Sequence, residues 1–316
     1  MKQARSRLRG KRDKKVWKGR GSMRFGISLY SISRKLTSGE VTPQQAVEWL
    51  ANVAGAEVIE ITPFGVDIIA DGRLAGELKR IAADNGSVIA NYSLNANFLQ
   101  IPESEYISEL ERVKLHIDGA AELGAATVRV DASSYRRNPA DNGIENFMAD
   151  LPAIAEVYGK LCEYARQYNI VVLIENHGFY INGSDRVGAV LSQVSCVNFA
   201  YQLDVGNFLC VDEQPVPAVG RLIGKAMTVH MKDFYVRGHD PGDATQFDCS
   251  GSWFRSQHGE YLRGSILGQG DVDMGKIAGI IKGAGFDGCV YLEFEGMEDC
   301  YYGTKVGFEN MKKLLG

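Results

Sequence analysis

Four successive apolar runs in the second half of the sequence end in, or carry close to their ends, an acidic residue or a histidine. The runs are VVLIE, FAYQLD, MTVHM and VYLEFE, and the polar residues are Glu175, Asp204, His230 and Glu293. Burying an ionised carboxylate costs several kcal/mol unless a cation or hydrogen-bond donors compensate it. If the runs are neighbouring strands, one divalent cation is a compact way to satisfy all four side chains. We therefore predict a metal site here; the alternative is that each residue is separately a helix cap or an ion-pair partner.

The predicted ligand set holds three carboxylates and one imidazole, which are mostly hard donors. Such a set favours Mn²⁺, with Mg²⁺, Co²⁺, Fe²⁺ or Zn²⁺ as alternatives, and disfavours thiolate chemistry. Glu295 competes with Glu293 for the same position, because residues two apart on a strand face the same side. We expect Glu293 to bind the metal and Glu295 to contact substrate at the rim.

The elements that must position these residues alternate regularly from Met23 onward. Apolar runs with strand character are followed by stretches of helical spacing. Helix ends are marked by Thr42 before Pro43 and by glycines at 55, 124 and 285. The predicted strands span residues 24–29, 57–62, 87–92, 126–131, 170–175, 198–204, 226–231 and 288–294.

This order predicts parallel strands joined by right-handed crossovers, and hence an α/β fold: a single (β/α)8 TIM barrel over residues 23–316. Active sites on this fold collect at the carboxyl ends of the strands, where the four polar residues stand. An open doubly wound sheet is the alternative, but the segment after the first strand has no G-x-G-x-x-G phosphate turn.

Charge is concentrated at the start of the chain. Residues 1–22 hold ten Lys/Arg and one Asp, a balance of +9, so the formal total of −4 leaves −13 for the rest. We predict that residues 1–22 are a disordered leader, the alternative being a tail that binds a polyanion, and that the acidic body makes nucleic acid an unfavoured partner. The six cysteines form no C-x-x-C pair, and no apolar run approaches the roughly 18 residues of a membrane span. We expect a cytoplasmic protein with reduced thiols and no membrane partner.

The segments LIENHG, LDVGNF, VHMKDF and GFDGCVYLEFEG resemble the signatures of the xylose-isomerase-like sugar isomerase/epimerase family, and the resemblance extends from Met23 over essentially the whole chain. That family also holds ketose 3-epimerases, inosose dehydratases and metal-dependent endonucleases that cut abasic DNA. The resemblance implies one metal held by Glu175, Asp204, His230 and Glu293. It also implies that Glu175 and Glu293 are catalytic and exchange protons with the carbon of a bound keto-sugar.

Two departures bear on the reaction. Ketose 3-epimerases usually have a histidine where this chain has Asn207, and an arginine where it has Lys232, so a ketose 3-epimerase is less favoured. We expect Asn207 and Lys232 to bind substrate, although Lys232 could instead pair with Asp233 at the surface. The expected activity is metal-dependent enolisation of a keto-sugar or polyol, giving isomerisation or epimerisation.

His177 keeps a second reaction open. It stands two residues after Glu175 and thus on the same side, where it could act as a base or bind a sugar hydroxyl; alternatively it only bonds to loop backbone. The Glu-Asn-His order resembles family members that act on 3-oxo-glycosides, including the larger subunit of C-glycoside deglycosylases. The alternative function is therefore a lyase with His177 as base.

The segment between Lys232 and Gly270 reads as one loop of nearly 40 residues. Its aromatic residues Trp253, Phe254 and Tyr261 could stack on a sugar or an aglycone, and Arg263 is the candidate for binding a substrate oxygen. We expect an oligomer, with a second subunit as a further option. An endonuclease acting on abasic DNA and a non-catalytic sugar-binding barrel are the less favoured functions.

Overall fold

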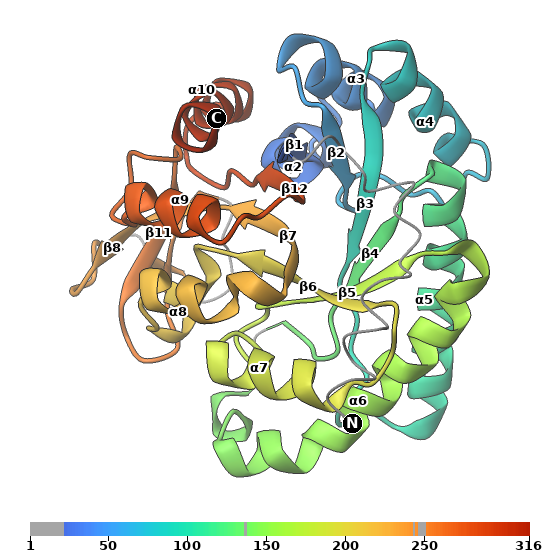
Figure 1. Cartoon of the computed structure of the whole chain (residues 1–316), viewed down its shortest axis with the longest axis vertical. Helices are drawn as coiled ribbons and strands as arrows, with labels where there is room; N and C mark the ends of the chain where they lie inside the picture. The colour runs from blue at the N-terminus through green and yellow to red at the C-terminus, as the bar shows by residue number, and fades with distance from the viewer. Residues whose placement is uncertain (1–21, 136–137, 243, 246–250) are drawn as a thin grey trace.

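The computed structural model describes residues 22–135, 138–242, 244–245 and 251–316 of the chain. Within them, eight parallel strands close into a barrel in the order β1-β12-β7-β6-β5-β4-β3-β2, with the helices around the outside (Figure 1). The predicted single (β/α)8 barrel is confirmed. The barrel strands are β1 Arg24–Ser28, β2 Val58–Ile61, β3 Val88–Leu94, β4 Thr127–Val130, β5 Val171–Glu175, β6 Phe199–Asp204, β7 Ala226–Met231 and β12 Cys289–Leu292.

The helices begin and end largely where the sequence predicts. Thr42 makes a capping box with Gln45 before α3, and Gly124 closes α5 with a φ of 82°. Gly55 and Gly285 also adopt positive φ, as expected of residues that stop a helix. The helices are α2 Ser33–Thr37, α3 Pro43–Glu48, α4 Leu74–Asp84, α5 Glu103–Leu123, α6 Ile144–Ala165, α7 Ser184–Gln193, α8 Pro215–Leu222, α9 Met274–Gly283 and α10 Cys300–Leu315.

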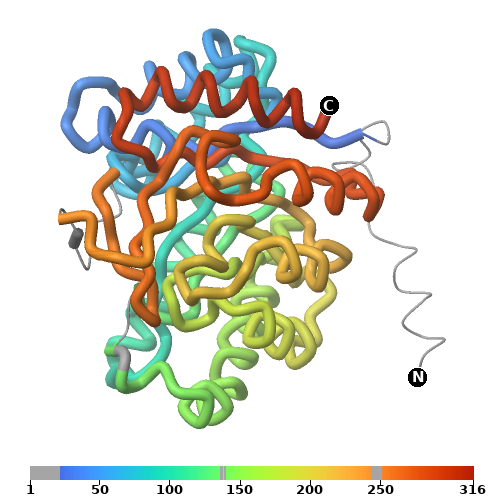
Figure 2. Tube along the Cα trace, turned by 90° about the vertical axis from the view of Figure 1, so that its left-hand side faces the viewer, coloured from blue at the N-terminus to red at the C-terminus, as the bar shows by residue number. Residues whose placement is uncertain are grey.

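The two ends of the described chain meet where the barrel closes. β1 pairs with β12 in parallel, with Ile27 opposite Leu292. Figure 2 shows α10, in dark red, beside the blue part of the tube where the described chain begins. Ser31 in the short helix η2 (Leu29–Ile32) donates a hydrogen bond to the Leu292 carbonyl at 3.3 Å. The barrel therefore has no free strand edge, and the strand ends that carry the acidic residues face one mouth.

The segment after β7 corrects one prediction. It is not a single loop, because it contains four short strands, β8 Asp233–Arg237, β9 Ala244–Thr245, β10 Trp253–Arg255 and β11 Tyr261–Ser265. They form a separate sheet in the order β8-β11-β10-β9, beside α8 and α9 in Figure 1. A bridge between Gly264 and Gly296 fastens this inserted sheet to the segment after β12. A side chain at Gly264 would overlap the Glu295 backbone, so this close approach requires glycine.

The structure does not test the predicted disordered leader. The predicted leader, residues 1–22, lies outside the described residues except for Ser22. In the described part of the chain, no helix has the length and apolar character needed to cross a membrane.

Candidate metal centre

Each of the four predicted ligands stands at or just beyond the carboxyl end of its strand. Glu175 and Asp204 are the last residues of β5 and β6, His230 is the penultimate residue of β7, and Glu293 directly follows β12. Because these strands are neighbours in the barrel, the ends converge. One ligand atom from each residue lies within 4.8 Å of the others.

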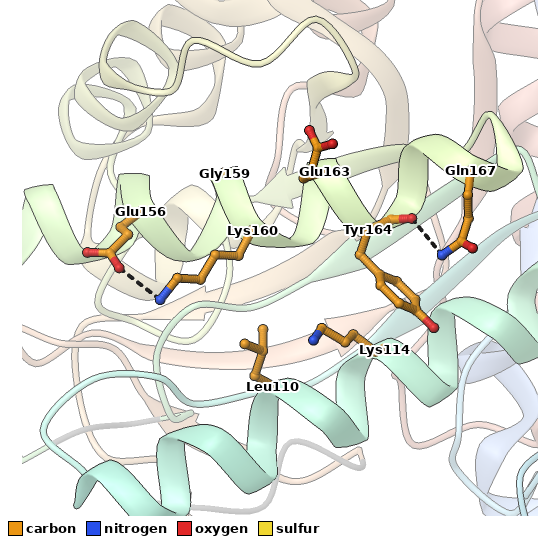
Figure 3. Close-up of a pocket in the computed structure, with 8 residues that line it drawn as sticks. All are labelled: Leu110, Lys114, Glu156, Gly159, Lys160, Glu163, Tyr164 and Gln167. Carbon is orange, nitrogen blue, oxygen red and sulfur yellow. Dashed lines mark hydrogen bonds and ion pairs between the residues drawn. The ribbon is translucent and has the colours of Figure 1, made fainter.

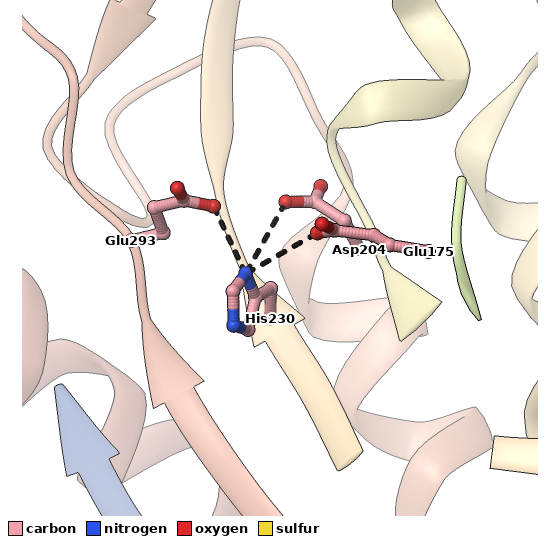
Figure 4. A group of neighbouring side chains, drawn as sticks. All are labelled: Glu175, Asp204, His230 and Glu293. Atoms are coloured by element: carbon pink, nitrogen blue, oxygen red, sulfur yellow. Dashed lines mark hydrogen bonds and ion pairs between the residues drawn. The ribbon is translucent and has the colours of Figure 1, made fainter. Parts of the chain in front are cut away.

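The geometry centres on one nitrogen of His230. Its Nδ1 lies 2.9 Å from Glu293 Oε2, 3.4 Å from Glu175 Oε1 and 3.9 Å from Asp204 Oδ2. Figure 4 shows Glu293 on one side of the imidazole and Asp204 and Glu175 on the other. Ligand atoms that each lie about 2.0–2.2 Å from one ion are separated by distances of this size. The four side chains therefore fit a single small divalent cation.

Local hydrogen bonds hold the ligands in place. Asp204 Oδ1 accepts the N–H groups of Gly206 and Asn207, each at 2.8 Å, and Oδ2 accepts no hydrogen bond within the described part of the chain. Asn176, buried behind Glu175, donates to the Asp204 carbonyl at 2.8 Å and accepts the Asp204 N–H at 2.9 Å. These bonds join the ends of β5 and β6, and leave one Asp204 oxygen directed at the cluster.

Burial and the nearby cations act in opposite directions on the pKa values of the carboxylates in the cluster. Burial raises the pKa of Asp204 to about 6, with Glu293 and Glu175 adding to the rise and Lys232 opposing it. Burial also acts to raise the pKa of Glu175, but Arg129 and His230 outweigh it and lower the value to about 2. The pKa of Glu293 is lowered in the same way, because Lys232 and His230 outweigh burial. Three carboxylates are thus held close together, and the protein cations outweigh burial at Glu175 and Glu293 but not at Asp204.

Lys232 lies inside the site. Only 5% of its side chain is exposed, and its Nζ lies 3.1 Å from Glu293 Oε2, 3.5 Å from Asp204 Oδ2 and 3.6 Å from Glu295 Oε2. The alternative of a surface pair with Asp233 is wrong. Asp233 points to the other side of the chain and accepts the N–H groups of Gly268, Gly270 and Val272. Consecutive side chains of extended backbone alternate in direction, so the two cannot meet.

Of the other residues predicted to bind substrate, Asn207 and Glu295 lie beside Lys232, whereas Arg263 does not. Asn207 Oδ1 accepts from Lys232 Nζ at 3.2 Å, and its buried Nδ2 has no hydrogen-bond partner among the described residues. Burial raises the pKa of the neighbouring Glu295 carboxyl to about 7. Arg263 lies instead on the inserted sheet, over the rings of Tyr235 and Trp253 at 5.1 and 5.0 Å, so its predicted substrate contact stays a prediction.

The aromatic residues of the inserted sheet differ in exposure. Phe254 is buried and packs edge-on against Phe234, so stacking of Phe254 on a ligand is ruled out. Trp253 and Tyr261 are partly exposed, and arginine side chains lie over both rings.

His177 is the end of a chain of buried charges. Its Nδ1 lies 3.0 Å from Asp131 Oδ2, Asp131 Oδ1 lies 3.1 Å from Arg129 NH1, and Arg129 Nε lies 2.9 Å from Glu175 Oε2. Burial acts to lower the pKa of His177, but Asp131 outweighs it and raises the value. The imidazole therefore bonds to a carboxylate, and its side chain keeps 20% of its surface exposed.

Sequence reasoning missed three residues of this site. Arg129 and Asp131 stand two apart at the end of β4, and Glu60, on β2, lies 2.9 Å from His230 Nε2. Each is a charged residue in a predicted strand, at residues 57–62 or 126–131, and a charge in a strand is the signal that identified the ligands. A single charge in a short run does not by itself indicate that side chains from distant strands converge.

A hollow lies on the outer flank of the barrel, away from the cluster. Figure 3 shows it between α5 and α6, lined by Leu110, Tyr164 and the charged residues Lys114, Glu156 and Lys160. It shares no residue with the cluster.

Comparison with known proteins agrees with the fold. The sequence model of the family described as "Xylose isomerase-like TIM barrel" matches residues 47–313. No curated protein sequence matches the chain.

Solved structures match over nearly the whole chain at low identity. A zinc-bound IOLI protein has a TM-score of 0.70 at 14% identity, covering 93% of this chain and 98% of that one. A probable 3-DHS dehydratase, AsbF, from Bacillus anthracis has 0.69 at 16%, covering 92% and 99%. A D-allulose 3-epimerase from Methylomonas sp. has 0.65 at 16%, covering 93% and 98%.

A further match is to a longer protein. The chain spans 42% of the length of a xylose isomerase-like TIM barrel/4-hydroxyphenylpyruvate dioxygenase fusion protein, at 19% identity and a TM-score of 0.68.

Proposed function

We propose that this chain, which belongs to the xylose isomerase-like TIM barrel family, is a metal-dependent enzyme that enolises a keto-sugar or related polyol. The observation that carries the proposal is the convergence of Glu175, Asp204, His230 and Glu293 within 4.8 Å at the barrel mouth. Buried carboxylates in such number are stabilised by a cation, and the two protein cations beside them are each shared among several acids. The ligand set favours Mn²⁺, with Mg²⁺, Co²⁺, Fe²⁺ or Zn²⁺ as alternatives.

The reaction follows from where the carboxylates stand. A divalent ion bound there would polarise a substrate carbonyl and the neighbouring hydroxyl, and so acidify the C–H bond between them. Glu175 and Glu293 lie on opposite sides of His230 Nδ1 (Figure 4). One of them takes the proton from carbon and keeps it, and the other delivers its own proton to the opposite face of the same carbon, which gives epimerisation; delivery of a proton to the neighbouring carbon gives isomerisation. The D-allulose 3-epimerase of similar fold supports this reaction class.

The charges at the mouth favour an uncharged substrate. Arg129 is paired with Glu175 and Asp131, and Lys232 with Glu293, Asp204 and Glu295, so neither cation is left over for a phosphate or a carboxylate. The N–H groups of Lys232 and Asn207 are better suited to sugar hydroxyl or carbonyl oxygens. We accordingly assign neutral keto-sugars as the substrate class.

One observation favours a second candidate, a lyase that acts on 3-oxo-glycosides. His177 is bonded through Nδ1 to Asp131, the arrangement by which a carboxylate orients a histidine base. In the lyase reaction His177 takes the proton next to the carbonyl, and the bond to the β substituent then breaks with its electron pair leaving on the aglycone. The likeness in fold to a dehydratase is consistent with an elimination.

Two measurements test the function. Elemental analysis of the purified protein and of its D204N variant should show one equivalent of divalent metal in the former and loss of it in the latter. The metal-loaded protein is then incubated in D₂O with neutral ketoses and with 3-oxo-glycosides. Deuterium at the carbon next to the carbonyl without aglycone release supports the isomerase, and aglycone release supports the lyase. Absence of metal, or exchange that persists in both E175Q and E293Q, would refute the proposal.

A further inference from the structure

Glu60 reaches the metal centre from the opposite side of the barrel. It lies on β2, and only 1% of its surface is exposed. Four donors converge on its carboxylate: Ser28 Oγ on Oε1 at 2.6 Å, and Asn91 Nδ2, Ser93 Oγ and His230 Nε2 on Oε2 at 2.5, 2.9 and 2.9 Å. An ionised carboxylate accepts hydrogen bonds and donates none. The arrangement therefore stabilises a buried anion by donors alone.

This carboxylate determines which nitrogen of His230 is available to a metal. Since Glu60 can only accept, the hydrogen of a neutral His230 ring is on Nε2, and the lone pair is on Nδ1. Nδ1 is also the nitrogen that lies 2.9–3.9 Å from the oxygens of the other three ligands. Both contacts fix the plane and the rotation of the ring, so that the imidazole cannot flip without breaking the bond to Glu60.

We infer that Glu60 is a positioning residue of the metal centre, which orients His230 so that Nδ1 is the ligand and thereby sets the metal affinity. The inference rests on the proposed function, since it assumes a metal at the cluster. Carboxylates that accept from a ligating histidine commonly change metal affinity on the order of 10–100-fold when removed. Glu60 itself is not one of the four candidate ligands.

The competing reading is that Glu60 only stabilises the polar interior of the barrel. Asn91 also donates to Gln202 at 2.8 Å and accepts from Thr127 at 2.6 Å, so Glu60 belongs to a wider network. T127V disturbs this network without touching Glu60 or His230, and is therefore the matched control. E60Q keeps the shape of the side chain. Its amide NH₂ group is a hydrogen-bond donor, however, and it faces groups that themselves donate to the carboxylate of Glu60.

The experiment measures Mn²⁺ binding to metal-stripped protein by calorimetry, for the full chain and the E60Q, T127V and D204N variants. We expect E60Q to bind Mn²⁺ on the order of 10–100-fold more weakly than the unmodified chain, and T127V to bind it nearly as well. Equal affinity of E60Q and the unmodified chain, or equal weakening in E60Q and T127V, overturns the inference. If the unmodified chain binds no metal, or D204N binds it equally well, the proposed function fails instead.

A spectroscopic test does not depend on the folding of E60Q. The chain has five histidines, so the ¹⁵N-histidine spectrum of the Zn²⁺-loaded protein is simple. One histidine should show a metal-bound Nδ1 and a protonated Nε2, and its signals should disappear in H230N. Coordination through Nε2 would overturn the inference even if E60Q could not be purified.

Discussion

The hollow between α5 and α6 (Figure 3) and the barrel mouth (Figure 4) are built from the same kinds of side chain, but their charges differ in how far they are exposed to water. On the flank, Lys160 pairs with Glu156 at 2.8 Å and Lys114 with Glu111 at 2.6 Å, and the two glutamate side chains are 67% and 62% exposed. Water screens such pairs, so that they add little to stability and impose no requirement on their surroundings.

At the mouth the same chemistry is removed from water. The side chains of Glu175, Asp204 and His230 are at most 2% exposed, and Lys232 is 5% exposed. Acids outnumber bases in this small volume, and repulsion between the carboxylates is not screened. A count of charged residues would therefore not distinguish the two regions. The difference lies in burial and in the balance of charge, and it is what makes the mouth a ligand site and the flank an ordinary surface.

The largest expected effect comes from removing the cation that holds two of the mouth acids. In R129M, Glu175 and Asp131 lose their shared partner while remaining buried, so the free energy of unfolding should fall by about 3–5 kcal/mol. Urea denaturation of the metal-free protein measures this. Added Mn²⁺ should restore part of the loss, because the ion neutralises Glu175.

R129K is the matched control for this change. It keeps the charge but not the planar fork of donors, and should be intermediate. If R129M were as stable as the unmodified chain, the buried charges at the mouth would not be interdependent, and the contrast with the flank would not hold.

The next effect in size is metal-dependent stabilisation. A ligand at 100 times its Kd stabilises the folded state by about 2.7 kcal/mol, which for a chain of 316 residues is a Tm rise of about 4 °C. The unmodified chain should show this rise with Mn²⁺. D204N should lack it, and without metal it should be no less stable than the unmodified chain, because one of three crowded carboxylates becomes neutral.

E156Q supplies the comparison from the flank. It also neutralises one carboxylate beside a lysine, but at an exposed position, so its Tm with and without Mn²⁺ should match that of the unmodified chain. A metal-induced rise that persists in D204N would place the ion elsewhere.

The sequence predicts the barrel and the four-residue cluster for the same reason. Strands of a parallel barrel are buried on both faces, so Glu175, Asp204, His230 and Glu293 stand out against apolar neighbours, and consecutive strands bring them to one mouth. Glu60 and Arg129 obey the same rule but lie on β2 and β4, and only the three-dimensional closure of the barrel shows that they face His230 and Glu175.

The inserted sheet was not predictable in the same way. Its strands are two to five residues long, and β8 pairs with β11 from Asp233–Ser265 to Arg237–Tyr261, across more than 20 residues. Short strands with distant partners give no periodic signal, because each carries too few alternating residues. The direction of the Lys232 side chain, by contrast, can be predicted once Asp233 is known to begin a strand, because consecutive side chains of extended backbone point to opposite sides.

The smallest effect concerns a histidine on the flank side of the fold. His116, on α5, lies with Nδ1 2.8 Å from the Tyr92 hydroxyl, and burial together with Arg112 lowers its pKa below 6.5, against the opposing effect of Asp67 and Glu109. The unfolded chain then takes up the proton first as the pH falls. Stability should therefore be lost as the pH is lowered through about 6.5 towards the depressed value in the folded state.

H116Q keeps a hydrogen-bonding group but does not titrate. Urea denaturation between pH 8 and pH 5 should show a shallower loss of stability in H116Q than in the unmodified chain, whether or not Mn²⁺ is present, because His116 is remote from the cluster. Parallel pH profiles for the two proteins would contradict the lowered pKa. A difference that appeared only in the metal-free protein would show that the flank and the mouth are coupled, and that the contrast between them is one of degree.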